Sequence, residues 1–501
     1  MLILLILVVI LPIIGAMFAL IFKNRLTNWF AVLFALATAV VGVMAGIKSF
    51  PGTYLKMLSG GMPWIKELDN TKLFGVSIDP LSALLIGLVT VMGVLITIYS
   101  TEYLSPRNKE HPTQDDHRRY FFWLLIFIGA MVGIAVSPNL LQLFIFWELT
   151  TLCSWALISH NHNHDRPALH AGFKALMMTH VGGIFYLIGL FILFIFTKSF
   201  DFKALGELDA SMRSLVFFLF LMAAWAKAAQ IPFHTWLPSA MEAPTPISAY
   251  LHAAAMVKAG VYLVARISME TWSISSGMGL VVAIMAMVTM FMALLFYFLQ
   301  DDLKKLLAYS TIAHLSYILL GISLGIMGSS KGFQGGILHI LCHGVAKTTL
   351  FLTVGAISYS MGTKKISELG GIARKLPIET FAFFIGAFAV TGIPPFACFW
   401  SKFLIFTGAM DIKGVIGPIL MVLVIIESVT SFSWFLWVGH KVFFGPPKVR
   451  TVAEITSGLS TPEAALAHDP PAIHWVLIAL AIACIVVPLV GIPLVQAISV
   501  P

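Results

Sequence analysis

Charged side chains are scarce in this sequence. Only 11% of the 501 residues are Asp, Glu, Lys or Arg, whereas 59% are hydrophobic and the mean hydropathy is +0.94. So few polar groups cannot cover a soluble protein of this length. The sequence therefore predicts a membrane protein. Its first apolar run, residues 2–22, is too long for a signal-peptide core and is followed by Lys23 and Arg25, so we interpret it as an uncleaved membrane span.

Motifs that hold a cofactor are also absent. The sequence has only four cysteines, none in CxxC spacing, and it contains neither a P-loop nor a GxGxxG motif that opens a helix after a strand. We therefore expect no cofactor in this chain. The net charge of +8 is explained more simply by basic loops on one side of a membrane than by binding of nucleic acid.

Long apolar runs occur throughout the sequence. A window of about 20 residues predicts an all-α polytopic membrane protein with about fourteen transmembrane helices. They are residues 2–22, 28–48, 80–99, 120–137, 139–158, 170–196, 213–231, 246–268, 278–299, 306–327, 334–360, 380–409, 414–444 and 471–496.

Basic residues are distributed unequally between the predicted loops. Of 31 Lys and Arg residues, seventeen lie in or beside odd-numbered loops, ten in or beside even-numbered loops and four within spans. Because basic loops stay in the cytoplasm, this distribution predicts cytoplasmic odd-numbered loops and places both termini on the outer side.

Six ionisable residues lie within the predicted spans. An ionisable group at the bilayer centre costs at least about 2.5–3.5 kcal/mol, so a set of six indicates function. The alternative is that each acid neutralises a base and so joins two helices. The six residues are Glu148, Lys227, Lys258, Lys347, Lys402 and Glu427.

Histidines extend this series. His339, His343 and Lys347 are spaced at i, i+4 and i+8, which places them on one helix face. We favour a proton relay, with structural hydrogen bonding or a metal site as alternatives; a third metal ligand is missing nearby in sequence, and Lys347 would repel a cation. Other spans contain His180, His252 and His314.

Two predicted spans are interrupted. Pro232 and Pro238 follow Lys227, and the GIPP segment at 392–395 precedes Lys402. Such breaks are tolerated at membrane depth only where they are buried in protein or line a cavity. Their positions, five spans apart, predict two inverted five-helix repeats with broken seventh and twelfth helices, in which the two lysines occupy related positions.

The predicted repeats divide the chain into four parts. Helices 1–3 occupy residues 1–110, the first repeat 111–270 and the second repeat 271–447. A polar loop and helix 14 complete the chain at 448–501.

Several long motifs resemble one known family. The WEL motif at Glu148, QIPFHTWLPSAMEAPTPISAYLHAAAMVKAG after Lys227, DDLKKLLAYSTIAHLSY, HILCHGVAKTTLFL and GIPPFACFWSK are similar to the antiporter-like proton-pumping subunits of respiratory complex I and related complexes. The resemblance covers about residues 75–445. Within the family, LITIYSTEYL, WALISH, MTHVGG and IESVTSFSWF most resemble component D of hydrogenase-4.

The resemblance implies roles for individual residues. Glu148 and Lys227 would be the acid and base of a first half channel, and Lys402 would end a second half channel. Burial disfavours the charged form of both Glu148 and Lys227, while proximity favours both charged forms, so movement of Glu148 could control proton release from Lys227. The central relay would comprise His252, Lys258, His339, His343 and Lys347, and His314 is a further candidate for proton translocation.

Two departures from the family pattern stand out. His180 and Gly183 occupy positions where many members have an arginine and an aspartate, which implies that a charge pair able to modulate Glu148 is missing. Glu427 is an additional acid. We expect Glu427 to share a hydrogen-bonded path with Lys402; the rival interpretation is that it carries protons across a subunit interface.

The resemblance also implies partners. It implies a prokaryotic inner-membrane complex with other membrane subunits and soluble hydrogenase or other redox subunits, which would hold a nickel–iron site and iron–sulfur clusters. The transported ion would be the proton, with sodium as an alternative. Two other functions stay open, a component of an Mrp-type cation/proton antiporter and a pump subunit of complex I. A third alternative is a scaffold with an inactive channel.

Overall fold

The computed structural model describes residues 1–23, 25–59, 73–112, 117–160, 166–271, 273–448 and 470–498. These residues form the expected all-α bundle of membrane-crossing length. Thirteen helical segments among them are long and apolar enough to cross a membrane. The shorter helices α14 and α15 together occupy the predicted twelfth span.

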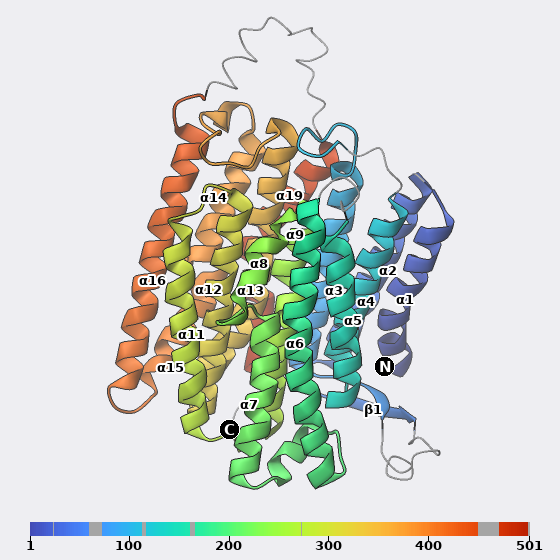
Figure 1. Cartoon of the computed structure of the whole chain (residues 1–501), viewed down its shortest axis with the longest axis vertical. Coiled ribbons are helices and arrows are strands. Elements are labelled where there is room, and N and C mark those ends of the chain that lie inside the picture. The colour runs from blue at the N-terminus through green and yellow to red at the C-terminus, as the bar shows by residue number, and fades with distance from the viewer. Residues whose placement is uncertain are drawn as a thin grey trace, which may run out of the picture.

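The helices run along one common direction (Figure 1). In the first half they are α1 (Leu2–Ile21), α2 (Arg25–Ser49), α3 (Pro80–Tyr103), α4 (Arg118–Val136), α5 (Leu140–Ile158), α6 (Arg166–Thr197), α7 (Ala210–Lys227), α8 (Trp236–Ser239), α9 (Thr245–Ala249) and α10 (Met256–Thr271). In the second half they are α11 (Ser276–Tyr297), α12 (Leu303–Ile326), α13 (Ser330–Met361), α14 (Pro377–Thr391), α15 (Ala397–Met410), α16 (Ile416–Gly439) and α19 (Pro471–Gln496).

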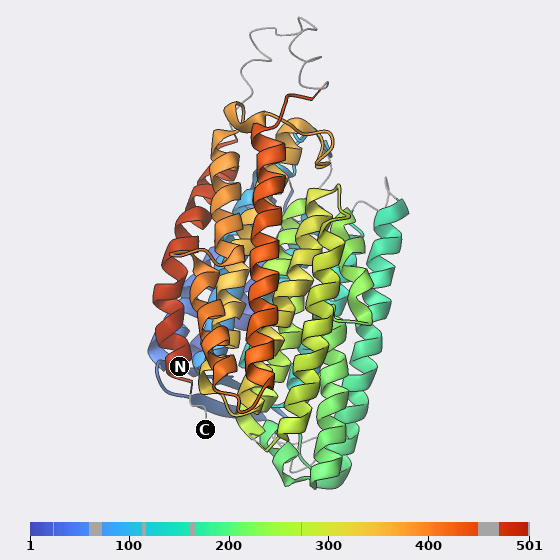
Figure 2. The same ribbon diagram turned by 90° about the vertical axis from the view of Figure 1, so that its left-hand side faces the viewer.

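The start of α1 and the end of α19 lie at one end of the bundle (Figures 1 and 2). An even number of crossings has this result. The loop after α3 and the loop after α13, which carry many of the basic residues, lie at the opposite end (Figure 1). The arrangement therefore separates the basic loops from the termini, while the side of the membrane that each faces stays a prediction.

The two helix breaks differ in form. After α7 ends at Lys227, the chain turns at Ala229, whose φ is 48°, and then forms only short helical turns up to Glu242. The second break divides two helices of similar length, and Gly392, with φ 90°, ends the first of them in a left-handed conformation that glycine adopts readily. A lysine precedes the first break and follows the second, and the inverted repeats stay a prediction.

One element was not expected from the sequence. Strands β1 (Tyr54–Ser59) and β2 (Phe74–Ile78) pair antiparallel outside the helices. The Gln142 side chain on α5 holds β2 by accepting from Gly75 N at 2.9 Å and donating to Gly75 O at 3.0 Å. The hairpin thereby anchors the end of the bundle near the start of α5.

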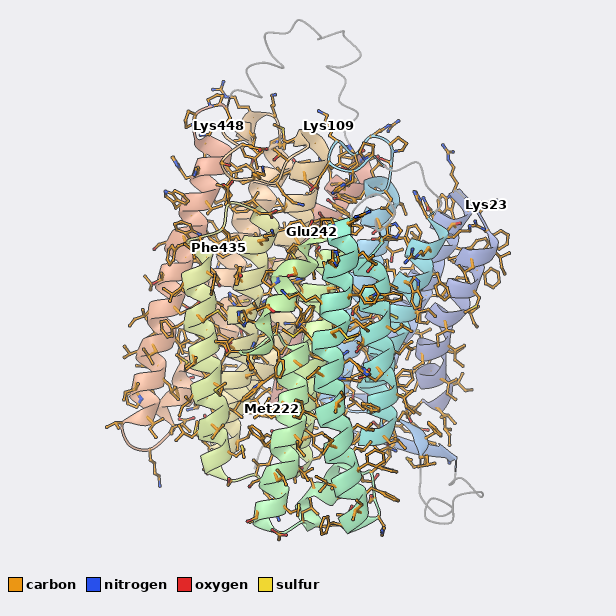
Figure 3. All side chains as sticks on the ribbon, viewed as in Figure 1. Lys23, Lys109, Met222, Glu242, Phe435 and Lys448 are labelled. Atoms are coloured by element: carbon orange, nitrogen blue, oxygen red, sulfur yellow. The ribbon has the colours of Figure 1, made fainter. Side chains whose placement is uncertain are left out.

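The two most enclosed segments carry His252, Lys258, His339, His343 and Lys347. The crossing formed by α9, the π-helical turn Tyr250–Ala254 and α10 is buried along its apolar window, as is α13. In contrast, α1, α6, α16 and α19 expose many large apolar side chains to the outside, and side chains project outward all around the bundle (Figure 3). The outer ring of helices therefore forms a lipid-compatible surface around a polar axis.

Candidate functional site

Lys227, the last residue of α7, is buried against α5. Its Nζ donates to the carbonyl oxygen of Trp147 at 2.8 Å and to the hydroxyls of Thr150 and Thr151 at 2.6 and 2.8 Å. The ammonium also lies 5.0 Å from the centre of a Trp147 ring. All these partners are neutral. Lys227 is therefore a buried base held by dipoles rather than by a carboxylate.

Glu148 lies beside these partners on α5 but faces another residue. Its Oε2 is 3.0 Å from Nδ1 of His180 on α6, and the His180 side chain is 57% exposed. Within the described residues no Glu148–Lys227 ion pair is present within 4 Å. A Cβ at Gly183 would collide with the Glu148 carboxylate, so the glycine makes room for it. His180 therefore contacts Glu148 directly at one of the two positions where the charge pair was expected to be missing.

The central histidines form one buried path. Lys258 Nζ is 2.6 Å from His343 Nδ1, and the His343 and His314 rings stack with centres 5.2 Å apart. His314 Nδ1 is 3.0 Å from His339 Nε2, and His339 Nδ1 is 2.8 Å from the Ser401 hydroxyl. We call these five residues the histidine path. It connects α10, α13, α12 and α15.

Two residues of the expected relay lie beside this path. Lys347 shares the α13 face of the histidines but donates to the Ser310 hydroxyl at 2.5 Å and to Leu307 O at 3.3 Å on α12. His252, in the π-helical turn, packs on the Phe351 ring at 4.9 Å. Neither ring nitrogen of His252 has a hydrogen-bond partner among the described residues. The structure therefore places His252 in the polar interior without joining it to the histidine path.

Lys402 and Glu427 are joined through two hydroxyls. Tyr317 OH donates to Glu427 Oε2 at 2.5 Å and lies 2.8 Å from Ser428 Oγ. Lys402 Nζ donates to the same Ser428 oxygen at 2.8 Å and lies 4.5 Å from the centre of the Tyr317 ring. The expected hydrogen-bonded path between Lys402 and Glu427 is therefore present. Glu427 is buried inside the chain, which does not fit the rival interface position.

Aromatic contact brings the two groups of residues together. The Tyr317 ring stacks against His314 and His339 with ring centres 5.5 Å apart in both cases. A polar interior therefore runs from Lys258 through the histidines to Tyr317, Lys402 and Glu427. We call Lys402, Ser428, Tyr317 and Glu427 the second station, and Glu148, His180 and Lys227 the first station.

The arrangement suits proton transfer more than metal binding. Within the described parts of the chain, no group of three or more His, Cys, Asp or Glu side chains could hold a metal ion. Imidazole, phenol, hydroxyl and amine groups in sequence can each accept and release a proton. The chemistry supported by this geometry is the relay of protons between titratable groups.

Sequence reasoning missed a buried ion pair and a buried histidine–carboxylate hydrogen bond. Arg266, which is not among the six ionisable residues singled out in the sequence, is buried and donates to both carboxylate oxygens of Asp79, at 2.5 and 2.9 Å. Burial raises the pKa of Asp79, but Arg266 outweighs burial and holds it below the usual value. On α14, Glu379 accepts from His474 at 3.0 Å. The signal available for Arg266 was its position inside the predicted span 246–268.

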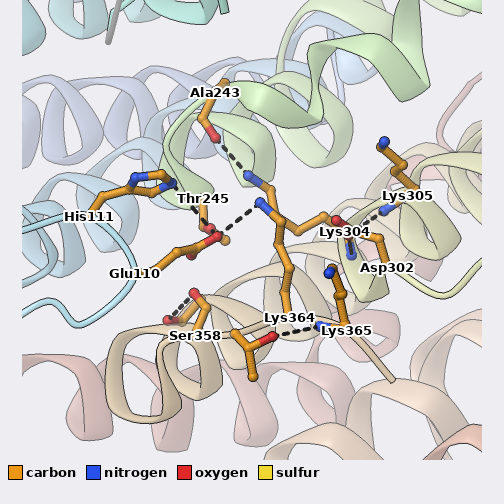
Figure 4. Close-up of polar contacts among 12 residues, drawn as sticks. Glu110, His111, Ala243, Thr245, Asp302, Lys304, Lys305, Ser358, Lys364 and Lys365 are labelled. Atoms are coloured by element: carbon orange, nitrogen blue, oxygen red, sulfur yellow. Dashed lines mark hydrogen bonds and ion pairs between the residues drawn. The ribbon is translucent and has the colours of Figure 1, made fainter. Parts of the chain in front are cut away.

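A further ionic cluster lies at the end of the bundle that carries the basic loops, and Figure 4 shows its contacts. Glu110 pairs with Lys364 at 2.9 Å, and the buried Lys304 donates to Ala243 O at 2.6 Å. Burial alone would raise the pKa of Glu110, but Lys364 and Lys304 hold it at about 2. This cluster, Glu110, Lys304 and Lys364, joins the loop after α3 to the broken segment and to the loop after α13.

Comparison with known families now identifies the chain. The family described as "NADH:quinone oxidoreductase/Mrp antiporter, TM" matches residues 137–431, which include both stations and the histidine path. The chain belongs to this family. The pattern described as "NADH-Ubiquinone oxidoreductase (complex I), chain 5 N-terminus" matches residues 64–122.

Curated relatives within the family come from different complexes. The chain is 34% identical to a subunit of the Na⁺/H⁺ antiporter of Alkalihalophilus pseudofirmus over 454 residues, 84% of this chain and 53% of that protein. It is 38% identical to the chloroplastic NAD(P)H-quinone oxidoreductase subunit 5 of Chara vulgaris over 360 residues, 68% of this chain and 52% of that protein. The chain thus spans about half the length of these relatives.

Solved structures share the same architecture. The Mrp complex from a Dietzia species contains a chain that matches 97% of this one, with 26% identity and a TM-score of 0.76, over 56% of its own length. A chain of the membrane-bound sulfane sulfur reductase, described as an archaeal respiratory membrane complex, matches 99% of this chain with a TM-score of 0.77 and 23% identity, over 96% of its own length. The second match shows the fold alone.

Family membership does not by itself select the partner enzyme. Relatives and structures include components of a quinone oxidoreductase, an antiporter and a respiratory complex. The likeness to component D of hydrogenase-4 therefore stays an interpretation of the motifs. What the family does establish is a multi-pass membrane protein of the antiporter-like type.

Proposed function

We propose that this chain moves protons across the membrane as part of a multi-subunit redox complex. The observation that carries the proposal is the buried series of side chains from Lys258 to His339. Hydrogen bonds join Lys258 to His343 and His314 to His339, and ring stacking joins His343 to His314. A structural ion-pair network would place acids opposite the bases, whereas this series consists of imidazole rings beside a lysine. Such a series can pass a proton from group to group.

The first station supplies control. An unpaired ammonium at membrane depth is costly, so the protonation of Lys227 depends on nearby charge. Lys227 is held here by Thr and Trp dipoles, while Glu148 contacts His180. If Glu148 turns toward Lys227, its charge stabilises the ammonium; when Glu148 returns to His180, Lys227 releases its proton more readily. The two partners of Glu148 therefore define two states.

The second station supplies the exit. Lys402 receives a proton from the histidine side and is connected to Glu427 through the Ser428 and Tyr317 hydroxyls. Each of these hydroxyls can donate and accept at once. A proton that reaches Lys402 can therefore be passed to Glu427 by rotation of two hydroxyls. Within the described residues two steps lack a direct hydrogen bond, from His343 to His314 and from the histidine path to Lys402. Both require reorientation of a side chain.

For the partner enzyme we propose a membrane-bound nickel–iron hydrogenase or formate hydrogenlyase, on the motifs that resemble component D of hydrogenase-4. The alternatives, a component of an Mrp-type antiporter and a pump subunit of complex I, receive equal support from the relatives. Purification of the intact complex distinguishes them, because only the first would contain soluble subunits with nickel and hydrogen-oxidising activity.

The transport function is tested by reconstitution. The purified complex in sealed vesicles should acidify or alkalise the interior when its redox reaction is started, as reported by a pH-sensitive dye. Turnover without any dye response, in vesicles that hold an imposed pH gradient, would contradict proton translocation. A dye response that requires Na⁺ rather than redox turnover would support the antiporter alternative.

A further inference from the structure

A pocket of about 610 Å³ is lined by residues of three parts of the bundle, and several of these residues carry polar groups. Its walls are the first turns of α6, the helical turns of the first break, and the junction of α11 and α12. The side chains that carry polar groups into it are His170, Lys174, Ser239, Glu242, Gln300, Lys305 and Tyr309. None of these residues belongs to either station or to the histidine path.

The charge of the pocket favours an anion. Lys174 Nζ reaches across to donate to the Ser239 hydroxyl at 3.0 Å. The Lys305 side chain points away from the cluster of Glu110, Lys304 and Lys364 (Figure 4). Within the described residues neither lysine has a carboxylate within 4 Å. Two ammonium groups and one imidazole therefore share the pocket with a single acid, Glu242.

The surroundings of the pocket favour a lipid over a soluble anion. Further along α6, Met177 and Val181 are 55% and 42% exposed. Leu295 on α11 is 66% exposed, and Leu299, just beyond the end of that helix, is 74% exposed. These residues belong to the apolar outer surface of membrane-crossing helices. A ligand with an anionic headgroup in the pocket could therefore lay its hydrocarbon chains along α6 and α11.

The depth of the pocket agrees with a headgroup. Lys174 is eight residues from the start of α6, which at about 1.5 Å per residue puts it roughly 12 Å inside that end of the helix. Glu242 lies in the same half of the bundle as Lys109 and Lys448 (Figure 3). This is the end of the basic loops, which the sequence predicts to face the cytoplasmic leaflet, where anionic lipids raise the affinity of basic sites.

We propose that this pocket binds the headgroup of an anionic phospholipid, with Lys174 and Lys305 as the phosphate-binding groups. Ser239, Gln300 and Tyr309 supply further hydrogen-bond donors, and Glu242 limits how much negative charge the site accepts. Because Ser239 and Glu242 belong to the segment that follows Lys227, a bound lipid contacts the first break directly. The site is independent of which redox or antiporter complex contains the chain.

The test measures retained lipid on the purified membrane complex in detergent. Radiolabelled dioleoyl phosphatidylglycerol is titrated, with dioleoyl phosphatidylcholine as the zwitterionic comparison. Removing both ammonium groups with Lys174→Gln and Lys305→Gln should weaken phosphatidylglycerol binding about thirtyfold, at roughly tenfold per 1.4 kcal/mol and about 1 kcal/mol per basic residue. Phosphatidylcholine binding should not change.

A matched pair of variants controls for net charge. Lys109→Gln with Lys375→Gln removes two exposed lysines outside the pocket and should leave phosphatidylglycerol binding within twofold. Glu242→Gln should change binding in the opposite direction and tighten it several-fold, which loss of folding cannot imitate.

Three results would overturn the proposal. Equal binding by the wild type and the Lys174→Gln, Lys305→Gln variant would show that these lysines do not hold lipid. Equal loss in the control pair would show a general charge effect. Displacement of bound phosphatidylglycerol by millimolar inorganic phosphate, with phosphate binding unaffected by detergent, would assign the pocket to a free anion.

Discussion

Lys227 and Lys402 are both buried lysines beside a helix break, yet their ammonium groups meet different surroundings. Lys227 is held by neutral groups of α5, and the nearby acid Glu148 contacts the exposed His180. Lys402 is connected to the buried Glu427 through two hydroxyls. Because Glu148 is not bound to Lys227, it can change position and so switch the protonation of that lysine. Glu427 is joined to Lys402 by hydrogen bonds, which suits continuous proton transfer between the two.

The largest effect on proton movement is expected from a substitution in the first station. Lys227→Ala removes the only amine of the first station, so coupled proton movement should fall to background. Membrane insertion should persist, because an apolar replacement removes an insertion cost. The measurement is dye-reported proton movement per redox turnover in vesicles, with the amount of assembled complex as the control. Normal pumping by an assembled Lys227→Ala complex would leave the first station without a role.

A second prediction tests whether the second station acts as one unit. Glu427→Gln and Lys402→Ala should each lower coupled activity by at least about tenfold, since loss of a positioned acid or base costs about 10²–10⁴-fold in proton transfer. The double variant should be little worse than either single one, because the residues share one path. If the fold-loss of the double variant instead equals the product of the two single fold-losses, the two residues act separately.

The third prediction concerns the histidine path. In the double variant His339→Gln, His343→Gln, the glutamine amides can still form hydrogen bonds but do not titrate near neutral pH. Proton transfer should therefore slow by about tenfold. His252→Gln is a suitable comparison, since His252 has no hydrogen-bond partner among the described residues and should affect transfer less. Unchanged turnover in the double variant would favour structural hydrogen bonding by these histidines.

The sequence predicted these stations unevenly, for physical reasons. Buried charge in an apolar run is visible in any sequence, so Lys227, Lys402 and Glu427 were identified. Spacing along one helix also placed His339 and His343 on one face. Contacts between distant helices leave no such pattern, so the sequence did not pair Lys227 with Thr150.

Hydroxyl residues were missed for a related reason. Tyr317 and Ser428 are common residue types in membrane helices, and only the packing of α12 against α16 makes them a bridge. A usable signal existed, because Tyr317 lies three residues after His314 and therefore on the same helix face. The β-hairpin was missed because its strands are short and lie in a polar connection between apolar runs.

The smallest effect on transfer is expected outside both stations, in the Glu110 cluster (Figure 4). Glu110→Gln breaks an ion pair whose acid is only 10% exposed. Its folded pKa of about 2 lies below the reference value of 4.5, so the pair's contribution is fully present above about pH 4.5 and is lost as the pH falls toward 2. That difference corresponds to about 3 kcal/mol. At neutral pH the variant should therefore unfold at lower temperature while proton movement per turnover stays within twofold. Between pH 4.5 and 2 the wild type should lose stability more steeply than the variant.

Glu368→Gln, which breaks the exposed pair with Lys365, is the control and should change stability by less than about 1 kcal/mol. If Glu110→Gln instead stops proton movement without lowering the unfolding temperature, the cluster belongs to the transfer path, and the distinction between transfer residues and scaffold residues fails at this end of the bundle.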